Sequence, residues 1–341
     1  MADSPTNRSG ATASRCARCH ALLAPGDRFC AVCGSTRRLA ETGSRRGRGV
    51  RLVVVSAVVL LAVFAAVAWI YFSAPERRQA HAIARITDPP PLSLALAPGD
   101  GSLVLLGSAS GPQVSTDAGD NWQFVGSGAK GEIAAAAPSG SALYLANPGL
   151  FRGDGRAWQP VATDLPTDSI RGLAVDPRDP NRLYAVVSGH GFYRSDDAGA
   201  RWTLLGNAIP TDADGLAIGP GNLFYLATAG HGVFASQEGQ AWSNASGFVN
   251  GALPTPNIRA IAFDPRSGDS YAGPNGEHLT GALYVATDRG LFKSIDGGSS
   301  WSALPLPEPL VALAVDASHR MIAIGADGSV YRSNDGGVSW D

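Results

Sequence analysis

The chain has 341 residues, of which 45% are hydrophobic and 16% are charged, so it can bury a substantial core in one large domain. Its net charge of −2 hides an asymmetry: residues 1–51 contain ten arginines against Asp3, Asp27 and Glu41, and so carry +7. The basic part is therefore short and N-terminal, which favours contact with a membrane surface and argues against nucleic-acid binding by the large domain.

All four cysteines lie in this N-terminal part, in the stretch CARCHALLAPGDRFCAVC, which excludes a disulfide framework elsewhere. Two Cys-x-x-Cys pairs separated by ten residues can present four thiolates tetrahedrally to one zinc ion. Residues 13–36 resemble the short zinc-ribbon modules that often begin bacterial membrane proteins. We therefore expect a structural Zn²⁺ that supplies most of the folding free energy of this module. The expected ligands are Cys16, Cys19, Cys30 and Cys33.

The segment CARCH also matches the Cys-x-x-Cys-His signature of c-type haem attachment. The two alternatives demand opposite compartments, because haem attachment of this kind belongs outside the cytoplasm. Haem would leave the second cysteine pair without a purpose, and Met1 and Met321 are the only methionines. Zinc is therefore the expected metal, with His20 as a bystander.

Residues 37–51 form a basic segment, and residues 52–72 follow it as 21 uncharged residues that end in Trp69, Tyr71 and Phe72. A helix of this length spans about 30 Å, the thickness of the hydrocarbon core. Six arginines closely precede the span and two closely follow it, so the positive-inside tendency places the N-terminus in the cytoplasm. We expect a single-pass protein of the cell membrane whose large domain is extracytoplasmic.

Residues 73–89 form a linker, and residues 90–341 carry a repeat. The pattern Ser-x-Asp-x-Gly-x-x-Trp occurs four times, and two shortened copies, RGDGRAW and SQEGQAW, lie between the full ones. The six copies are spaced by 36, 44, 40, 59 and 39 residues, which is mostly the period of a four-stranded propeller blade. They end at Trp122, Trp158, Trp202, Trp242, Trp301 and Trp340.

The unit from Ser169 to Asn207 shows the repeat most clearly, as four segments with the strand period of two: RGLAV, RLYAVVS, FYRS and RWTLLG. In the turn before the fourth strand, Asp can accept backbone N–H groups, Gly supplies a positive φ, and Trp is large enough to be buried between blades. We assign this structural role to Asp117, Trp122, Asp197, Trp202, Asp296, Trp301, Asp335 and Trp340.

These turns resemble the Asp-box, or BNR, repeats of the sialidase-like propeller superfamily, which includes sialidases, xyloglucan hydrolases and photosystem II assembly factors. The resemblance implies an all-β, six-bladed β-propeller of four-stranded antiparallel blades, preceded here by one transmembrane helix and a zinc ribbon. It also implies that the boxes lie on the face opposite the usual binding face. The motif is specific for the fold and weak for activity.

Two irregular places need an explanation within this fold. The long interval before Trp301 contains PRSGDSYAGPNGEHLTG, which we expect to form a polar loop between the first and second strands of blade five. The chain stops at Asp341, where the fourth strand of the last blade should begin, and an unpaired edge there would be costly. We expect residues 81–87, HAIARIT, to supply that strand.

The residue that enters each inner strand varies from blade to blade, and these residues should ring one mouth of the central channel. They are Leu92, Glu132, Arg171, Asp214, Arg259 and Val311. The turns between second and third strands should place His190, His231, Arg289 and Asp327 on the same face. Arginines there could hold a ligand by bidentate contacts, or Arg171 and Arg259 could simply neutralise Glu132 and Asp214.

Sialidases need a tyrosine nucleophile and an arginine signature before the first box, and this chain has no such signature. Its tyrosines Tyr144, Tyr184, Tyr225 and Tyr284 recur in second strands, where packing explains them. We therefore expect a non-catalytic scaffold that binds a protein or glycan partner. The alternative is an exo-acting glycoside hydrolase using Glu132 and Asp214. Envelope sensing through the zinc ribbon is a third possibility.

Overall fold

The computed structural model describes residues 14–24, 27–36, 80–87, 90–97, 102–125, 129–137, 142–247, 251–273, 276–316 and 318–341. The chain divides into two compact units, Met1–Pro75 and Glu76–Asp341. The predicted basic segment 37–51 and the predicted span 52–72 lie outside the described residues. Within the described ranges, no helix has both the length and the apolar character needed to cross a bilayer.

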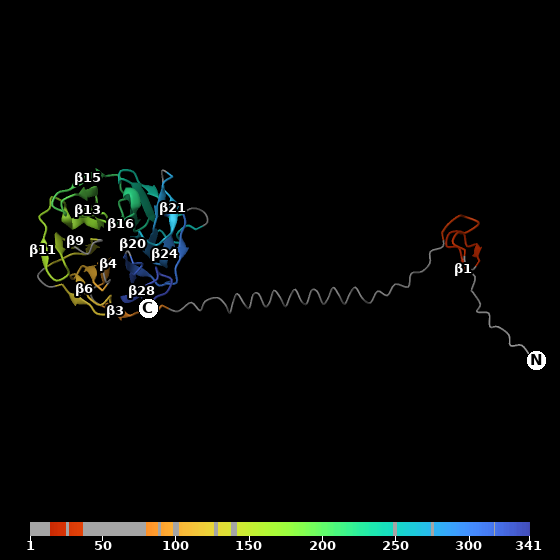
Figure 1. Cartoon of the computed structure of the whole chain (residues 1–341), viewed down its shortest axis with the longest axis horizontal. Helices are drawn as coiled ribbons and strands as arrows, with labels where there is room; N and C mark the ends of the chain where they lie inside the picture. The colour runs from red at the N-terminus through yellow and green to blue at the C-terminus, as the bar shows by residue number, and fades with distance from the viewer. Residues whose placement is uncertain are drawn as a thin grey trace, which may run out of the picture. The chain divides into compact units, whose positions relative to one another are not determined.

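The second unit is a ring of six four-stranded antiparallel sheets, as predicted (Figure 1). The strands of each blade are given from the inner to the outer strand. Blade one consists of β4 (Pro91–Leu96), β5 (Val104–Ser108), β6 (Gln113–Ser115) and β7 (Gln123–Phe124), and blade two consists of β8 (Ile133–Ala136), β9 (Leu143–Ala146), β10 (Leu150–Gly153) and β11 (Trp158–Pro160). Blade three consists of β12 (Ile170–Asp176), β13 (Asp179–Val187), β14 (Gly191–Ser195) and β15 (Thr203–Gly206). The 3₁₀ turn η1 (Thr167–Ser169) leads into the third blade.

Blade four consists of β16 (Ala213–Ile218), β17 (Leu223–Thr228), β18 (Val233–Gln237) and β19 (Ser243–Asn244), with the 3₁₀ turn η2 (Pro220–Asn222) after its first strand. Blade five consists of β20 (Ile258–Asp264), β23 (Ala282–Thr287), β24 (Gly290–Ser294) and β25 (Ser302–Ala303). Blade six consists of β26 (Leu310–Val315), β27 (Met321–Gly325), β28 (Ser329–Ser333) and β3 (Ala84–Arg85).

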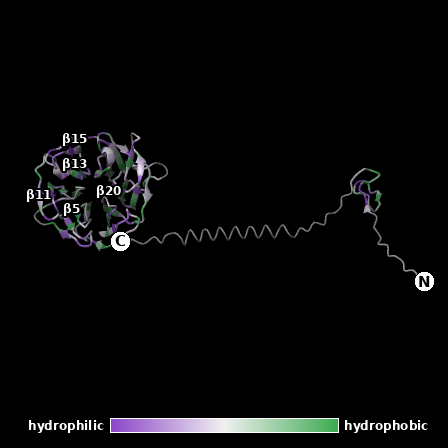
Figure 2. Cartoon of the chain, in the orientation of Figure 1, coloured by the Kyte–Doolittle hydropathy of each residue, from purple (hydrophilic) through white to green (hydrophobic). Residues whose placement is uncertain are grey.

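The core lies between neighbouring blades. Every residue of the second strands β5, β9, β17, β23 and β27 is buried, because each of these strands is covered on both faces. Figure 2 shows hydrophobic residues along the strands of the ring. The predicted packing role of the four tyrosines is confirmed, because none is more than 3% exposed. They are Tyr144, Tyr184, Tyr225 and Tyr284.

The ring is closed by the segment that the sequence predicts. β3 pairs antiparallel with β28, Ala84 opposite Val330 and Arg85 opposite Ser329. Asp341 exchanges two backbone hydrogen bonds with Arg332, of 2.8 and 2.9 Å, so both ends of the propeller share the position of the outer strand. All six sheets and the closing strand lie within Glu76–Asp341, and this unit therefore forms a complete ring by itself.

The box turns have the predicted hydrogen bonds. In blade three the Ser195 hydroxyl donates to Asp197 Oδ1 at 2.9 Å, and it accepts from the Gly199 amide at 2.9 Å. The Trp202 indole donates to the Gly199 carbonyl at 2.9 Å and contacts Thr163 Oγ1, after the outer strand of blade two, at 3.0 Å. The turn therefore fixes both its own hairpin and the neighbouring blade.

The insertion of blade five lies between its first and second strands, as predicted, but it is not the expected polar loop. Residues 265–281 contain a second hairpin, β21 (Ser270–Ala272) paired with β22 (His278–Thr280). Tyr271 is 9% exposed and its hydroxyl lies 3.3 Å from that of Tyr225 in blade four, while Leu279 is also buried. The insertion folds because it adds two large apolar side chains to the core between these blades.

We predict that the propeller loses stability in acid through the box carboxylates. Hydrogen bonds from Asn121 hold the pKa of Asp117 below its usual 3.8, and the Arg201 backbone N–H does the same for Asp197. A lowered folded-state pKa gives a stabilisation that is present above about pH 4 and is lost as the pH falls through the folded value.

The measurement is urea unfolding, followed by tryptophan fluorescence, at pH 7, 5, 4 and 3. The double variant D117N/D197N should lose less stability between pH 5 and pH 3 than the wild type, because two of the titrating groups are gone. D168N, at an exposed carboxylate outside the boxes, serves as the control. Equal slopes in the wild type and the double variant would show that the boxes do not cause the acid sensitivity.

Candidate functional site

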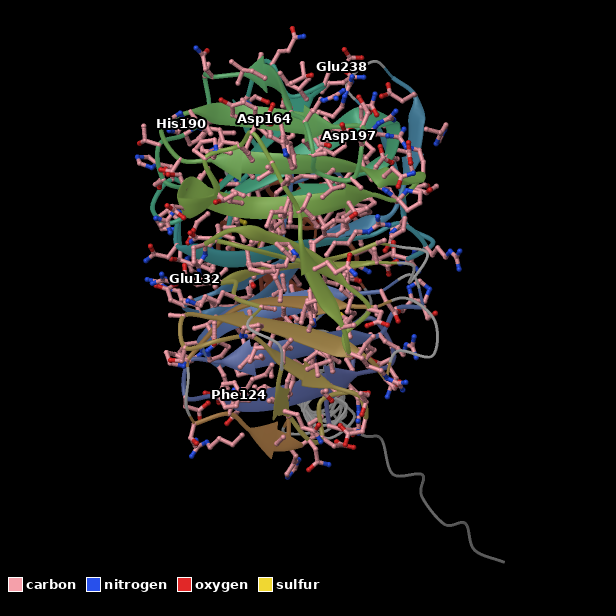
Figure 3. The ribbon with its side chains drawn as sticks, turned by 90° about the vertical axis from the view of Figure 1, so that its left-hand side faces the viewer. Phe124, Glu132, Asp164, His190, Asp197 and Glu238 are labelled. Carbon is pink, nitrogen blue, oxygen red and sulfur yellow. The ribbon has the colours of Figure 1, made fainter. Side chains whose placement is uncertain are left out.

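The propeller has two chemically different faces. We call the face where the inner strands begin the entry face, and the opposite face, which carries the Asp-box turns, the box face. Figure 3 shows Glu132 and His190 on one side of the ring and the box residues Asp197 and Glu238 toward the other. The predicted separation of the boxes from the variable strand-entry residues is therefore confirmed.

The strand-entry residues surround one cavity at the mouth of the channel. Its volume is about 180 Å³, and it is lined by five of the six predicted ring residues: Leu92, Glu132, Arg171, Asp214 and Arg259. Val311 does not line it. A cavity of about 150 Å³ can hold benzene, so this mouth has room for one ring or one side-chain end.

The two arginines of the mouth are available to a ligand. Arg171 and Arg259 are exposed, and neither forms an ion pair within 4.0 Å with any other residue that the structure describes. No ion pair within 4.0 Å joins either arginine to Glu132 or Asp214 among these residues, although the charges of both arginines act on Asp214. Free guanidinium groups have five donors in a planar fork, which suits carboxylate and other planar acceptors.

Asp214 has a perturbed pKa. It is exposed to the channel mouth, yet protein atoms surround much of its carboxyl group, and this desolvation raises the pKa. The nearby positive charges of Arg171 and Arg259 oppose the shift, whereas Asp212 and Glu132 add to it. The mouth thus contains one carboxyl group that protonates more readily than an ordinary aspartate.

Glu132 is held in place by its surroundings. The Asn147 side-chain amide donates to Glu132 Oε2 at 2.7 Å, and the Ser93 hydroxyl donates to the Glu132 carbonyl at 2.6 Å. Gly107 is required beside it, because a Cβ atom there would lie 2.2 Å from the same carbonyl oxygen. Glu132 therefore reaches the mouth from a fixed backbone position between blades one and two.

The sequence did not single out Asp212, which orients one predicted ligand residue. Asp212 Oδ2 lies 2.9 Å from His231 Nδ1 and accepts a 2.9 Å hydrogen bond from the Gly230 amide. Its Oδ1 atom is buried and has no hydrogen-bond partner among the described residues. No sequence signal distinguishes Asp212 from an ordinary turn aspartate, because the pairing is set by the blade geometry.

The other turn residues lie farther from the cavity. His190 and Arg289 are exposed on the entry face, but neither lines the 180 Å³ cavity. Asp327 has a structural role: its carboxylate pairs with Arg85 of the closing strand and accepts the Ser329 amide at 2.9 Å. The site thus consists of the mouth itself, and His231, like His190 and Arg289, does not line it.

The four cysteines of the first unit converge. Their sulfur atoms all lie within 4.8 Å of one another, with Cys16 and Cys33 3.6 Å apart and Cys19 and Cys30 3.5 Å apart. Zn–S bonds of about 2.3 Å in a tetrahedron place sulfur atoms about 3.8 Å apart, so the donor set fits this ion. The Ser35 hydroxyl and then the Arg18 amide lower the pKa of Cys16 to about 5, whereas hydrogen bonds with the neighbouring thiols outweigh one from the Ala21 backbone and raise the pKa of Cys19.

No family model matches the chain. A probable oligoxyloglucan-reducing end-specific xyloglucanase of Neosartorya fischeri is 30% identical over 159 residues, and the xyloglucanase Xgh74A of Acetivibrio thermocellus is 29% identical over 238 residues. These matches cover 41% and 56% of this chain, but 18% and 28% of the relatives, so the chain spans only a minor part of either enzyme's length.

Two solved structures have the same fold. A structural genomics protein of unknown function from Bacteroides thetaiotaomicron aligns with 74% of this chain and 71% of its own length, at 14% identity and a TM-score of 0.54. The GH74 xyloglucanase of Xanthomonas campestris aligns with 74% of this chain and 47% of its own length, at 19% identity and a TM-score of 0.51. At these identities the likeness establishes the propeller fold alone.

Proposed function

We propose that the chain is a membrane-anchored binding protein whose propeller holds a protein or glycan partner at the entry-face mouth. The observation that carries this proposal is the pair Arg171 and Arg259, which face a ring-sized cavity without ion-pair partners among the described residues. Each guanidinium is exposed and makes no ion pair within 4.0 Å among the described residues, so its N–H donors can bind an acceptor group of a partner. The partner would insert one polar group, such as a sugar ring or a side-chain carboxylate.

The second candidate function is an exo-acting glycoside hydrolase. Glu132 and Asp214 line the same cavity but have different surroundings, and the pKa of Asp214 is raised. Two carboxyl groups in unlike environments are the usual arrangement for acid and base in glycoside hydrolysis. The names of the xyloglucanase relatives favour a glucan as the substrate of such an activity.

A sialidase-type mechanism has less support. The four tyrosines of the second strands are buried, and burial raises the pKa of each hydroxyl, which disfavours the phenolate. A buried tyrosine with a raised pKa is a poor nucleophile. We therefore assign Tyr144, Tyr184, Tyr225 and Tyr284 to the core alone.

The remaining parts of the proposal concern the first unit and the segment after it. Residues 52–72 would cross the cell membrane once, with the N-terminus cytoplasmic and the propeller extracytoplasmic. Cys16, Cys19, Cys30 and Cys33 would bind a structural Zn²⁺, which would hold the two cysteine knuckles together. The propeller would then meet its partner outside the cytoplasm.

Two assays of the same variants distinguish binding from hydrolysis. Pull-downs from detergent-solubilised membranes measure partner capture, and incubation with xyloglucan oligosaccharides measures the release of reducing ends. If the chain is a binder, R171Q and R259Q should each weaken partner capture about tenfold or more, because each removes a charge-assisted hydrogen bond. R201Q is the matched control, since Arg201 is an exposed arginine in a box turn. No reducing ends should be released.

Release of reducing ends that is lost in both E132Q and D214N would favour the hydrolase. Partner capture unchanged in R171Q and R259Q would contradict the proposed binding site. Circular dichroism of each variant tests whether it retains the wild-type secondary structure.

The zinc proposal predicts one zinc ion per full-length chain by elemental analysis. C30S should lose the metal, because a three-thiolate set with a hydroxyl binds zinc far more weakly. H20A should keep full zinc content, and it separates the two alternatives, since covalent haem attachment through CARCH would show a haem absorption band that H20A perturbs. Wild-type protein that contains no zinc would contradict the proposal.

The membrane proposal predicts that the full chain stays in the pellet after alkaline carbonate extraction. In intact spheroplasts, an added protease should digest the propeller and leave the N-terminal ribbon protected. Replacing Leu60 and Leu61 by arginine should release the chain from the membrane, because each charge at the centre of a span costs about 2.5–3.5 kcal/mol. A protected propeller would reverse the assigned orientation.

A further inference from the structure

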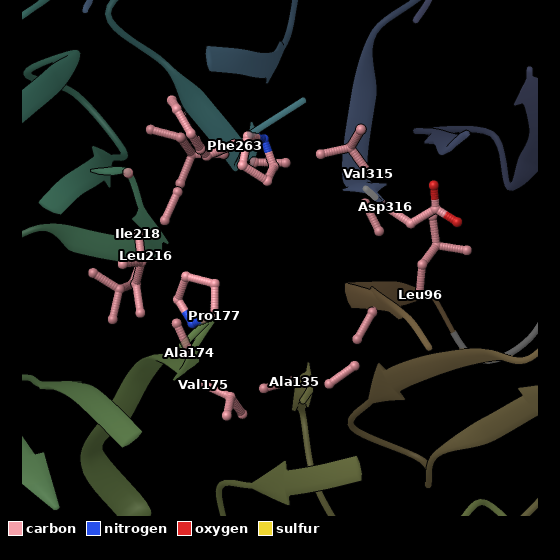
Figure 4. A pocket seen from close by; sticks show the side chains of 18 of the residues that line it. Leu96, Ala135, Ala174, Val175, Pro177, Leu216, Ile218, Phe263, Val315 and Asp316 are labelled. Carbon is pink, nitrogen blue, oxygen red and sulfur yellow. The ribbon is translucent and has the colours of Figure 1, made fainter. Parts of the chain in front are cut away.

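The channel widens below the mouth into a second and larger cavity. Its volume is about 510 Å³, and it opens toward the loops that join first and second strands, on the box face. Figure 4 shows side chains from successive blades around this space, among them Leu96, Ala174, Ile218, Phe263 and Val315. Most of the exposed lining is apolar, unlike that of the entry mouth.

The two cavities follow each other along the channel. Six residues, one from each inner strand, line both of them: Leu94, Ala134, Leu173, Leu216, Ile261 and Leu313. Below this layer each inner strand has an alanine at the equivalent position, and the short side chains leave the channel open. The charged mouth and the apolar cavity are thus consecutive sections with different chemistry.

The charges at the rim of the apolar cavity are already neutralised within their own blades. Arg178 Nε lies 3.0 Å from Asp176 Oδ1, and Arg320 Nε donates to Asp316 Oδ2 at 2.8 Å. Neither pair leaves a net charge for an ionic ligand. The other polar groups of the lining are the Thr280 hydroxyl and backbone groups on the free edges of the inner strands, since each inner strand pairs on one side only.

We propose that this cavity binds an uncharged, mainly apolar small molecule with a few hydrogen-bonding groups. The volume lies within the 300–1,000 Å³ typical of ligand pockets and is roughly three times that of a benzene-sized cavity. Binding removes the apolar walls from water, and the strand edges can pair with a hydroxyl, amide or carbonyl of the ligand. This site is independent of the partner site at the entry mouth.

The test uses N-phenyl-1-naphthylamine, which is uncharged at neutral pH and fluoresces in apolar surroundings. The propeller unit, residues 76–341, forms a closed ring by itself and avoids detergent, which would take up the probe. We expect saturable binding of one probe per chain at micromolar concentration. A174L, which reduces the volume, and V315D, which adds a carboxylate to the apolar wall, should each weaken it at least tenfold.

Two further variants serve as a conservative substitution and as a control. V315T is nearly isosteric, so it should fold even if A174L does not, and it should weaken binding several-fold because of its hydroxyl group. R171Q alters only the entry mouth and should leave probe affinity unchanged, while it weakens partner capture. Absence of saturable binding to the folded wild type, or unchanged affinity in V315T and V315D, would overturn the proposal.

Discussion

The ring depends on one hydrogen-bonded turn that is repeated in its blades. In each full copy a serine hydroxyl lies between an aspartate and a glycine amide, with Ser Oγ to Asp Oδ1 distances of 2.8–2.9 Å. The turn directs a tryptophan back toward the preceding blade: the Trp301 indole donates to the Ala245 carbonyl of blade four at 3.0 Å. The four full copies share this turn, whereas the two shortened copies, which end at Trp158 and Trp242, lack its serine–aspartate pair.

Closure places a different demand on the chain, because the first and last segments must meet. The closing strand β3 contributes only two paired residues, and Ile86 beside it is buried in the core shared by blades one and six. The Arg85–Asp327 ion pair joins residues 242 positions apart at this seam. The seam is thus held by apolar burial, by strand pairing and by surface ion pairs such as Arg85–Asp327 and Arg332–Asp120, which by themselves add little.

The sequence could predict those parts of the structure that follow from aligning equivalent positions of successive repeats. The box turns, the four strands of blade three, the closing strand and five of the six mouth residues follow from register alone. The contact of Tyr271 with Tyr225 does not, because it joins two blades whose distance depends on the assembled ring, and the side-chain contact of Asp212 with His231 within blade four was not predicted. The pairing of Asp327 with Arg85 was not predicted either, since these two residues are distant in sequence.

In this repeat fold, some equivalent positions keep the same residue from blade to blade and others vary. The box serine, aspartate, glycine and tryptophan recur in all four full copies because those blades share one turn, whereas the strand-entry residues differ in charge and size from blade to blade. The entry mouth can therefore recognise a partner by an asymmetric set of charges. The section below it has a mainly apolar lining without unpaired charges among its arginine and aspartate rim residues, so it would select by size and polarity. One channel thus offers two kinds of selectivity, and they can be tested by separate variants.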